Sequence, residues 1–469
     1  MADLDDLTLT QAVAAIRSGE LSPVELTEHV LACAAVTEPA VHAYAVIDAE
    51  AARAAASTAE QAVLHGEPLG PLHGVPLGVK DLFDTAGLRT AYGSPRYEGH
   101  VPDRDATAVA RLRAAGAVIV GKHTTHEFAW GGRTDSSYYG PTHNPHRPGH
   151  IAGGSSGGSA ASVAAGSCLG AIGTDTAGSV RIPAALSGCV GFKPSRGRVS
   201  LAGVMPLSPS LDHVGALART VADAAAIVEA IAGPDSADPR ALHLTDALVA
   251  QDAATARVAV PGGWFQELLH PAVRDAVAAT AAHLADLGLE VETVDFAGEA
   301  DMPHAVLTRI LFEAGLLHRP AFRTEPSSFG PDLAELLAAP APDPIELALM
   351  EAAIARFSAQ LLTLLSQYDA LLVPTVPVPA PSLGQRNVQF TTAAGETQVE
   401  VEHVLTRLTS PFNAAGLPAV SVPAGLADGL PVAVQVVGRP YDDRTALGVA
   451  ALVEDGGLGA RIRPSTVRP

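Results

Sequence analysis

Small residues and serines dominate residues 153–184, and this composition limits the structures that the segment can form. It opens with three serines among four glycines, in the order Gly153, Gly154, Ser155, Ser156, Gly157, Gly158, Ser159. Glycine adopts positive φ angles and strained conformations that other residues resist, so the chain can turn sharply here. Such a run is also typical of a flexible linker, but the apolar stretch 160–172 that follows disfavours a linker.

A second turn of small residues follows the apolar run 169–172. Residues 175–179 read Asp-Thr-Ala-Gly-Ser. This order predicts a buried strand, then a tight turn, then the start of a helix. Such a turn can direct several backbone N–H groups at one point, where they would stabilise a developing negative charge.

Lysine is rare in this chain. Of 30 basic residues, three are lysines: Lys80, Lys122 and Lys193. Arginine stays charged in proteins, whereas a buried lysine can become a neutral base. Lys80 ends the apolar run 73–79, which predicts a buried strand, and we interpret it as a base. We interpret Lys122 as a surface lysine at the end of another strand and Lys193 as structural.

Three motifs together resemble the amidase signature family of Ser-Ser-Lys hydrolases. They are GVPLGVKD (74–81), GGSSGGS (153–159) and GTDTAGSVRIPA (173–184). Ser155 and Ser179 lie 24 positions apart (179 − 155), which is the usual spacing in the family, and Lys80 precedes Ser155 by 75. The resemblance covers nearly the whole chain and implies one α/β domain over residues 1–469. Within it we expect N-terminal helices over 1–65, a catalytic core over 70–225 and a variable pocket rim over 310–400.

The resemblance implies a role for each of three residues. Ser179 would be the nucleophile, Ser155 would relay its proton from a position after a cis peptide bond at Gly154, and Lys80 would be the base. Burial must lower the pKa of Lys80 so that the amine starts neutral. The oxyanion hole would consist of the backbone N–H groups of Thr176, Ala177, Gly178 and Ser179.

Other residues of these motifs are expected to support the site: Gly154, Ser156, Thr174, Asp175 and Arg181. We expect Asp175 and Arg181 to pair across the turn, because buried charges usually need a partner. Ala177 stands where most members of the family have glycine. Its methyl group restricts φ and narrows the acyl side of the site, so we interpret it as a determinant of specificity.

Apolar and aromatic residues are the candidates for the substrate pocket, and they favour a hydrophobic acyl or aryl group. The candidates are Phe128, Trp130, Gly131, Gly132, Tyr138, Met205, Phe322 and Phe329. Residues 316–344 and 374–397 are proline-rich and predict irregular, mobile segments at the rim.

No metal or cofactor is expected. Five histidines cluster along the chain but lack a compact ligand spacing: His123, His126, His143, His146 and His150. Glu127 is interpreted as a contact of the pocket wall and core in preference to an acid or base.

The composition of the chain limits the kinds of partner that the protein can bind. The net charge of −20 (30 basic minus 50 acidic residues) disfavours binding to nucleic acid or anionic membranes, so we expect a small-molecule partner. Cys33, Cys168 and Cys189 are too few and scattered for a disulfide framework, and we expect them reduced and buried. The first residues lack a signal-peptide pattern, and no stretch has about 18 continuous apolar residues. We expect a cytoplasmic monomer or homodimer.

Apolar runs alternate with alanine-rich helical segments. We expect helices at 9–17 and 22–35, the second beginning with a capping box from Ser22 to Glu25. Buried strands are expected at 75–80, 117–121, 169–173, 258–260, 371–373, 419–422 and 432–437. This alternation predicts a mixed, mostly parallel, twisted sheet with helices on both faces.

The leading hypothesis is hydrolysis of a small amide through an acyl-enzyme on Ser179, with aryl amides, aliphatic amides, carbamates and esters all open as substrates. The alternative is the A subunit of a tRNA-dependent glutamine amidotransferase, a glutaminase that supplies ammonia. Such subunits usually carry lysine-alanine-glutamine and then arginine in the helix before a tyrosine-aspartate pair. Here residues 351–360 read EAAIARFSAQ before Tyr368 and Asp369, which lacks that pattern. A binding protein on an inactive scaffold is disfavoured, because all three catalytic positions are filled.

Overall fold

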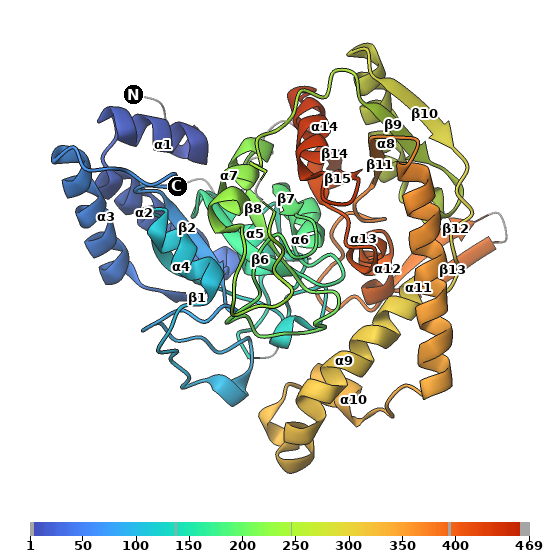
Figure 1. Cartoon of the computed structure of the whole chain (residues 1–469). Helices are drawn as coiled ribbons and strands as arrows, with labels where there is room; N and C mark the ends of the chain where they lie inside the picture. The colour runs from blue at the N-terminus through green and yellow to red at the C-terminus, as the bar shows by residue number, and fades with distance from the viewer. Residues whose placement is uncertain (1–3, 137, 245, 393–394, 460–469) are drawn as a thin grey trace.

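An eleven-stranded sheet forms the centre of the protein (Figure 1). The structure is a computed structural model and describes residues 4–136, 138–244, 246–392 and 395–459. The strand order is β1-β3-β2-β6-β8-β7-β14-β15-β11-β9-β10. The bounds are β1 (Tyr44–Ile47), β2 (Pro76–Lys80), β3 (Val118–His123), β6 (Gly170–Asp175), β7 (Val190–Lys193), β8 (His213–Ala218), β9 (Arg257–Pro261), β10 (Glu290–Val294), β11 (Ala370–Pro374), β14 (Ala419–Ala427) and β15 (Leu430–Gly438).

The sheet is mixed, as the sequence predicted. β3, β2 and β6 are parallel neighbours, and so are β11, β9 and β10 near the other edge. The pairs between these two groups are antiparallel, and β1 adds an antiparallel edge beside β3. Parallel pairing therefore occurs in two blocks, and among the described strands antiparallel neighbours outnumber parallel ones. All seven predicted strands are present, and β1, β7, β8 and β10 were not predicted.

Helices cover both faces of the sheet. Side chains alternate between the two faces of a strand, so a strand that is buried at every position is covered on both sides. β2, β6, β8 and β15 are buried along their whole length. The helices are α1 (Leu9–Ser18), α2 (Pro23–Val41), α3 (Ala49–Leu64), α4 (Thr107–Ala114), α5 (Gly157–Ala165), α6 (Arg181–Ser187), α7 (Val221–Ile231), α8 (Pro271–Asp286), α9 (Met302–Thr324), α10 (Pro331–Ala338), α11 (Pro344–Leu365), α12 (Val401–Arg407), α13 (Ser410–Ala414) and α14 (Asp443–Asp455).

The first two helices begin where the sequence predicted. The Ser22 hydroxyl accepts hydrogen bonds from the backbone N–H groups of Val24 and Glu25 at the start of α2. The reciprocal half of a capping box is present at α1, where Thr8 and Gln11 cap each other. The complete capping box therefore lies at the start of α1, whereas the sequence predicted it at the start of α2.

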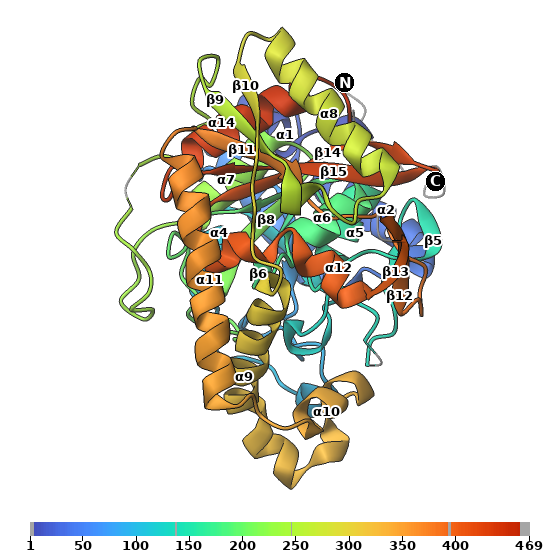
Figure 2. The same ribbon diagram turned by 90° about the vertical axis from the view of Figure 1, so that its right-hand side faces the viewer.

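The prediction of irregular chain over residues 316–344 is wrong. This region holds the end of α9, a short 3-10 helix η5 (Pro326–Ser328), and α10, and α11 begins at its last residue. Pro331 and Pro344 occupy the first turn of a helix, where proline costs no hydrogen bond, so they start helices. Figure 2 shows α9 and α11 side by side, extending away from the sheet, with α10 at the far end. Residues 374–397 likewise include β12 (Asn387–Thr392) and the start of β13 (Gly395–Glu400), which pair as a hairpin.

By length and composition alone, α11 is the one helix of the described ranges that could cross a membrane, with 22 residues and a mean hydropathy of 1.3. Helices of soluble proteins pass the same test. In this structure α11 packs along α9, where Arg309 pairs with Glu351.

Candidate active site

Three chain segments meet at one edge of the sheet. β2 ends at Lys80 and lies parallel to β6, so the carboxyl ends of both strands point the same way. The turn 176–180 follows β6 and leads into α6. The glycine and serine loop 153–156 precedes α5 and contacts this turn, because the Ser156 N–H donates to the Ser179 carbonyl at 3.1 Å. The fold thus brings the three sequence motifs together.

Lys80 is fully buried and faces hydroxyl groups. Its Nζ lies 2.7 Å from Ser155 Oγ and 2.8 Å from Thr174 Oγ1. Burial lowers the pKa of Lys80 well below its usual value, although the charges of Asp175 and Asp212 act to raise it. Burial therefore shifts Lys80 toward the neutral amine.

The backbone fixes Ser155 in front of Lys80. The peptide bond between Gly154 and Ser155 is cis, as expected. The Ser155 carbonyl accepts hydrogen bonds from His126 N–H at 3.3 Å and Thr134 Oγ1 at 3.2 Å. A Cβ atom on Gly154 would lie 2.8 Å from the backbone of residues 132 and 133 and from Thr134 Oγ1. Glycine is therefore required at this position.

Ser179 differs from Ser155 in its surroundings. Ser155 is fully buried, whereas Ser179 is 7% exposed. Within the described residues, the Ser179 hydroxyl has no hydrogen bond, and its link to the serine loop runs through the backbone contact with Ser156. Ser179 is thus the more accessible of the two hydroxyls.

Asp175 and Arg181 pair across the turn, as predicted. The guanidinium binds both carboxylate oxygens, at 2.9 and 3.0 Å, and both side chains are fully buried. Burial alone would raise the pKa of Asp175, but the charge and hydrogen bonds of Arg181 hold it well below its usual value. Gln435 Oε1 accepts a hydrogen bond from Arg181 Nη1, and Asn413 accepts one from Arg181 Nη2 and donates one to Asp175 Oδ1.

The predicted oxyanion hole needs one correction. The Gly178 N–H donates to Asp175 Oδ1 at 2.9 Å, so it is already used. Across the described residues, no hydrogen bond is formed by the N–H groups of Thr176, Ala177 and Ser179. The turn holds Gly178 at a φ of +127°, and a Cβ atom there would collide with Thr409. Three amides of the turn are therefore free to bind an oxyanion.

A cavity of about 140 Å³ adjoins this turn. Thr174, Thr176 and Asp212 give it polar atoms, and Arg240 adds a charged group. The other lining residues are Ala129, Leu201, Val204, Met205, Pro206, Leu207 and Pro209. Asp212 accepts a hydrogen bond from Thr176 Oγ1 at 2.6 Å, and burial raises the pKa of Asp212 to about 6. The sequence analysis did not identify Asp212, which lies just before β8, outside the three motifs.

Met205 is the one predicted pocket residue that lines this cavity. Phe128 is fully buried and stacks on His318 at 4.4 Å, because its left-handed backbone (φ 48°) turns the ring into the core. The neighbouring residue, Ala129, lines the cavity instead. The remaining candidates lie in other contacts: Phe329 packs on Phe128 and Phe322, Trp130 packs on the core, Tyr138 packs at a tilt against Tyr139, Gly132 N–H donates to Glu402, and Gly131 lies against His126.

Two further interpretations are settled by contacts. Lys122 is fully buried and pairs with Asp81 at 3.4 Å, so its prediction as a surface residue is wrong. Glu127 accepts hydrogen bonds from Ser94 Oγ and Gly330 N–H, which supports a structural contact.

The clustered histidines do not converge on a common point in the described residues. Of the five, His126 alone lies near other potential ligands, namely Asp135 and Asp332, and Arg133 contacts both carboxylates. The Arg133 guanidinium therefore already supplies the positive charge beside these two carboxylates.

A buried amine bound to a serine hydroxyl, beside free backbone amides, is typical of hydrolases that work by acyl transfer. Comparison with known proteins also indicates a hydrolase. The family model described as Amidase matches residues 25–447. The chain therefore belongs to the amidase signature family, and it is a hydrolase of carbon–nitrogen bonds.

Relatives of two kinds are similar over nearly their full length. The A subunit of a glutamyl-tRNA(Gln) amidotransferase from Roseiflexus sp. (strain RS-1) is 37% identical, with 96% of each chain covered. The 1-carboxybiuret hydrolase subunit AtzE from Pseudomonas sp. (strain ADP) is 35% identical, with 97% of this chain and 99% of the relative covered. A solved structure of a vestigial complex, related to the origins of an s-triazine catabolic enzyme, has a TM-score of 0.90 at 34% identity, covering 96% of this chain and 99% of that one.

Proposed function

We propose that the protein hydrolyses small amides through an acyl-enzyme on Ser179. The observation that carries this proposal is the hydrogen bond between the buried Lys80 amine and Ser155 Oγ at 2.7 Å. Because the neutral amine is favoured, the Ser155 hydroxyl can donate its proton to Nζ and in turn accept the proton of Ser179. A serine hydroxyl becomes an effective nucleophile only when a base removes its proton.

The first half-reaction forms one bond and breaks another. Ser179 Oγ attacks the carbonyl carbon of the amide, and the free N–H groups of Thr176, Ala177 and Ser179 hold the oxyanion. The proton from Ser179 passes through Ser155 to Lys80 and then returns to the leaving nitrogen as the C–N bond breaks. The products are an ester on Ser179 and a free amine or ammonia.

The second half-reaction releases the acid. Water loses a proton to the same relay and attacks the ester carbonyl, and Ser179 recovers its proton as it leaves. The mostly apolar cavity beside the turn favours a small hydrophobic acyl or aryl group on the substrate. Esters and carbamates pass through related intermediates, so they remain candidate substrates.

A glutaminase subunit is the second candidate, and the 37% identity to an amidotransferase A subunit favours it. The helix that carries the lysine and arginine pattern of such subunits corresponds to α11. Here residues 351–360 of α11 read EAAIARFSAQ, which lacks that pattern. This makes the small-amide hydrolase the better-supported proposal.

One experiment separates the two candidates. The chain is purified alone and assayed against a panel of aryl amides, aliphatic amides, carbamates and esters, with glutamine in parallel. Turnover of amides in preference to glutamine supports the proposal. Glutaminase activity alone, or activity that appears only with a partner subunit, would favour the second candidate.

A further inference from the structure

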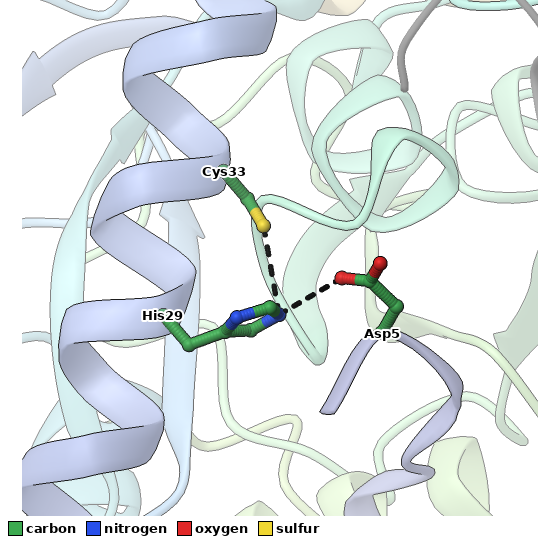
Figure 3. Close-up of side chains that lie close together, drawn as sticks. All are labelled: Asp5, His29 and Cys33. Carbon is green, nitrogen blue, oxygen red and sulfur yellow. Dashed lines mark hydrogen bonds and ion pairs between the residues drawn. The ribbon is translucent and has the colours of Figure 1, made fainter. Parts of the chain in front are cut away.

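Three side chains with metal-binding atoms meet in the N-terminal region (Figure 3). His29 and Cys33 lie one turn apart on α2, and Asp5 lies in the short helix η1 (Leu4–Asp6). His29 Nε2 is 3.0 Å from Asp5 Oδ1 and 3.6 Å from Cys33 Sγ. All three residues are partly exposed, whereas Cys168 and Cys189 are buried. The expectation that Cys33 is buried is therefore wrong.

The arrangement does not suit a nucleophilic relay. In a Cys-His-Asp relay the thiol and the carboxylate bind opposite nitrogens of the imidazole ring. Here both Asp5 and Cys33 approach the same nitrogen, Nε2 of His29 (Figure 3). A single proton on Nε2 cannot serve both contacts well, whereas one cation placed between the three atoms can.

The two distances to His29 Nε2 are close to those of a tetrahedral ion, and all three ligand atoms lie within 4.8 Å of one another. With usual zinc–ligand bond lengths, two ligand atoms on a tetrahedral Zn²⁺ lie about 3.4–3.6 Å apart. The separation of His29 Nε2 and Cys33 Sγ already has this value, and the partly exposed Asp5 carboxylate needs to move by about 0.4 Å. Ligands four residues apart on a helix, as His29 and Cys33 are, share one face and chelate zinc in other proteins.

We propose that Asp5, His29 and Cys33 form a zinc-binding site, with water as the fourth ligand. Binding releases the Cys33 thiol proton to solvent as the sulfur–zinc bond forms, and His29 keeps its proton on Nδ1. The ion would fasten η1 to α2, because its ligands come from both. The net charge of −20 favours a cation, and the Arg219 side chain, which donates to the backbone carbonyls of Asp5 and Leu7, opposes it.

The site is tested by spectroscopy on the full chain. The protein is stripped with a chelator and titrated with Co²⁺, which reports thiolate ligation as a charge-transfer band in the near ultraviolet. We expect one equivalent of Co²⁺ to bind, Zn²⁺ to displace it, and Zn²⁺ to raise the melting temperature. Cys33→Ser should abolish the band, and His29→Gln should weaken binding at least tenfold.

Matched controls are available in the chain. Cys189→Ser removes a buried thiol, and His304→Gln removes a histidine that lies 3.7 Å from Glu346 with no cysteine nearby. Both should keep the charge-transfer band and the Zn²⁺ effect on melting. Survival of the band in Cys33→Ser, or binding of less than one equivalent by the unmodified chain, would overturn the proposal and leave an ordinary His29–Asp5 ion pair.

Discussion

Lys80 and Lys122 lie on neighbouring parallel strands, both fully buried, with partners of different kinds. Lys80 contacts two hydroxyl groups, whereas Lys122 donates to the Phe83 carbonyl and the Thr90 hydroxyl and also pairs with the Asp81 carboxylate at 3.4 Å. Burial lowers the pKa of Lys122 to about 8, and it lowers that of Lys80 well below its usual value. Lys80 is thus suited to proton transfer, and Lys122 is suited to holding the chain that follows β2.

Replacement of Lys80 tests its role as the base. We expect Lys80→Arg and Lys80→Met to lower kcat/KM for an amide by about 10²–10⁴-fold, because neither side chain can accept the proton. Lys122→Met, a change at a buried lysine outside the relay, should instead lower thermal stability, because it removes the cation beside the buried Asp81 carboxylate. Equal losses of kcat/KM per folded enzyme in all three variants would contradict the assignment.

The pH dependence of activity and of stability should both follow the lowered pKa of Lys80. The base works when neutral, so kcat/KM should fall as the pH drops through the folded-state pKa. The unfolded chain binds this proton at a higher pH than the folded chain does, so Lys80 also destabilises the fold as the pH drops. Lys80→Met should therefore melt no lower than the unmodified protein, and any advantage should grow toward acidic pH. A scan of melting temperature against pH measures this.

Covalent labelling and a change of leaving group should distinguish the roles of Ser179 and Ser155. Ser179→Ala should abolish turnover and prevent labelling by a sulfonyl fluoride, because it removes the nucleophile. Ser155→Ala should lower amide hydrolysis far more than hydrolysis of an activated ester, whose leaving group needs little protonation. Peptide mapping of the label checks the first expectation, and a label found on Ser155 or Ser159 would show that the nucleophile was wrongly assigned.

The Asp175–Arg181 pair should dominate the stability of the turn. Asp175→Asn leaves a buried guanidinium without its counter-charge, which should cost about 3–5 kcal/mol in the free energy of unfolding. The pKa of Asp175 lies well below its usual value, so its contribution is present at neutral pH and lost only as the pH falls below the ordinary range of an aspartate. Denaturant unfolding at neutral and acidic pH checks both points, and a variant as stable as the parent would contradict them.

Motifs and long apolar runs allowed the core of the site to be predicted. Lys80, Ser155 and Thr174 meet because each belongs to a motif on a strand or loop whose position the pattern fixes. The strand β10 was missed because it lies at the sheet edge and its residues Glu290–Val294 are largely exposed and partly charged. Exposed edge strands carry no apolar run for a pattern to detect.

The pocket was harder to predict, because it depends on where side chains point. Phe128 and Ala129 are adjacent in sequence, yet positive φ angles at both send the ring to the core and leave the alanine at the cavity. Lys122 was wrongly predicted to lie at the surface because its partner, Asp81, directly follows β2, whereas Lys122 lies in β3. No local spacing in the sequence reveals this pair. Such contacts are set by tertiary packing.

The residues that line the cavity beside the turn should determine substrate preference. The aromatic residues that the sequence predicted for the pocket should not. Met205 lines the cavity, whereas Phe322 packs on Phe329 outside it. Shortening one apolar wall residue changes discrimination between substrates by about 10–200-fold. We therefore expect Met205→Ala to change the ratio of kcat/KM for bulky and small amides within that range, with Phe322→Ala as the matched control that leaves it within about threefold. If Phe322→Ala shifts the ratio and Met205→Ala does not, the substrate lies against α9, and the sequence prediction of the pocket was the better one.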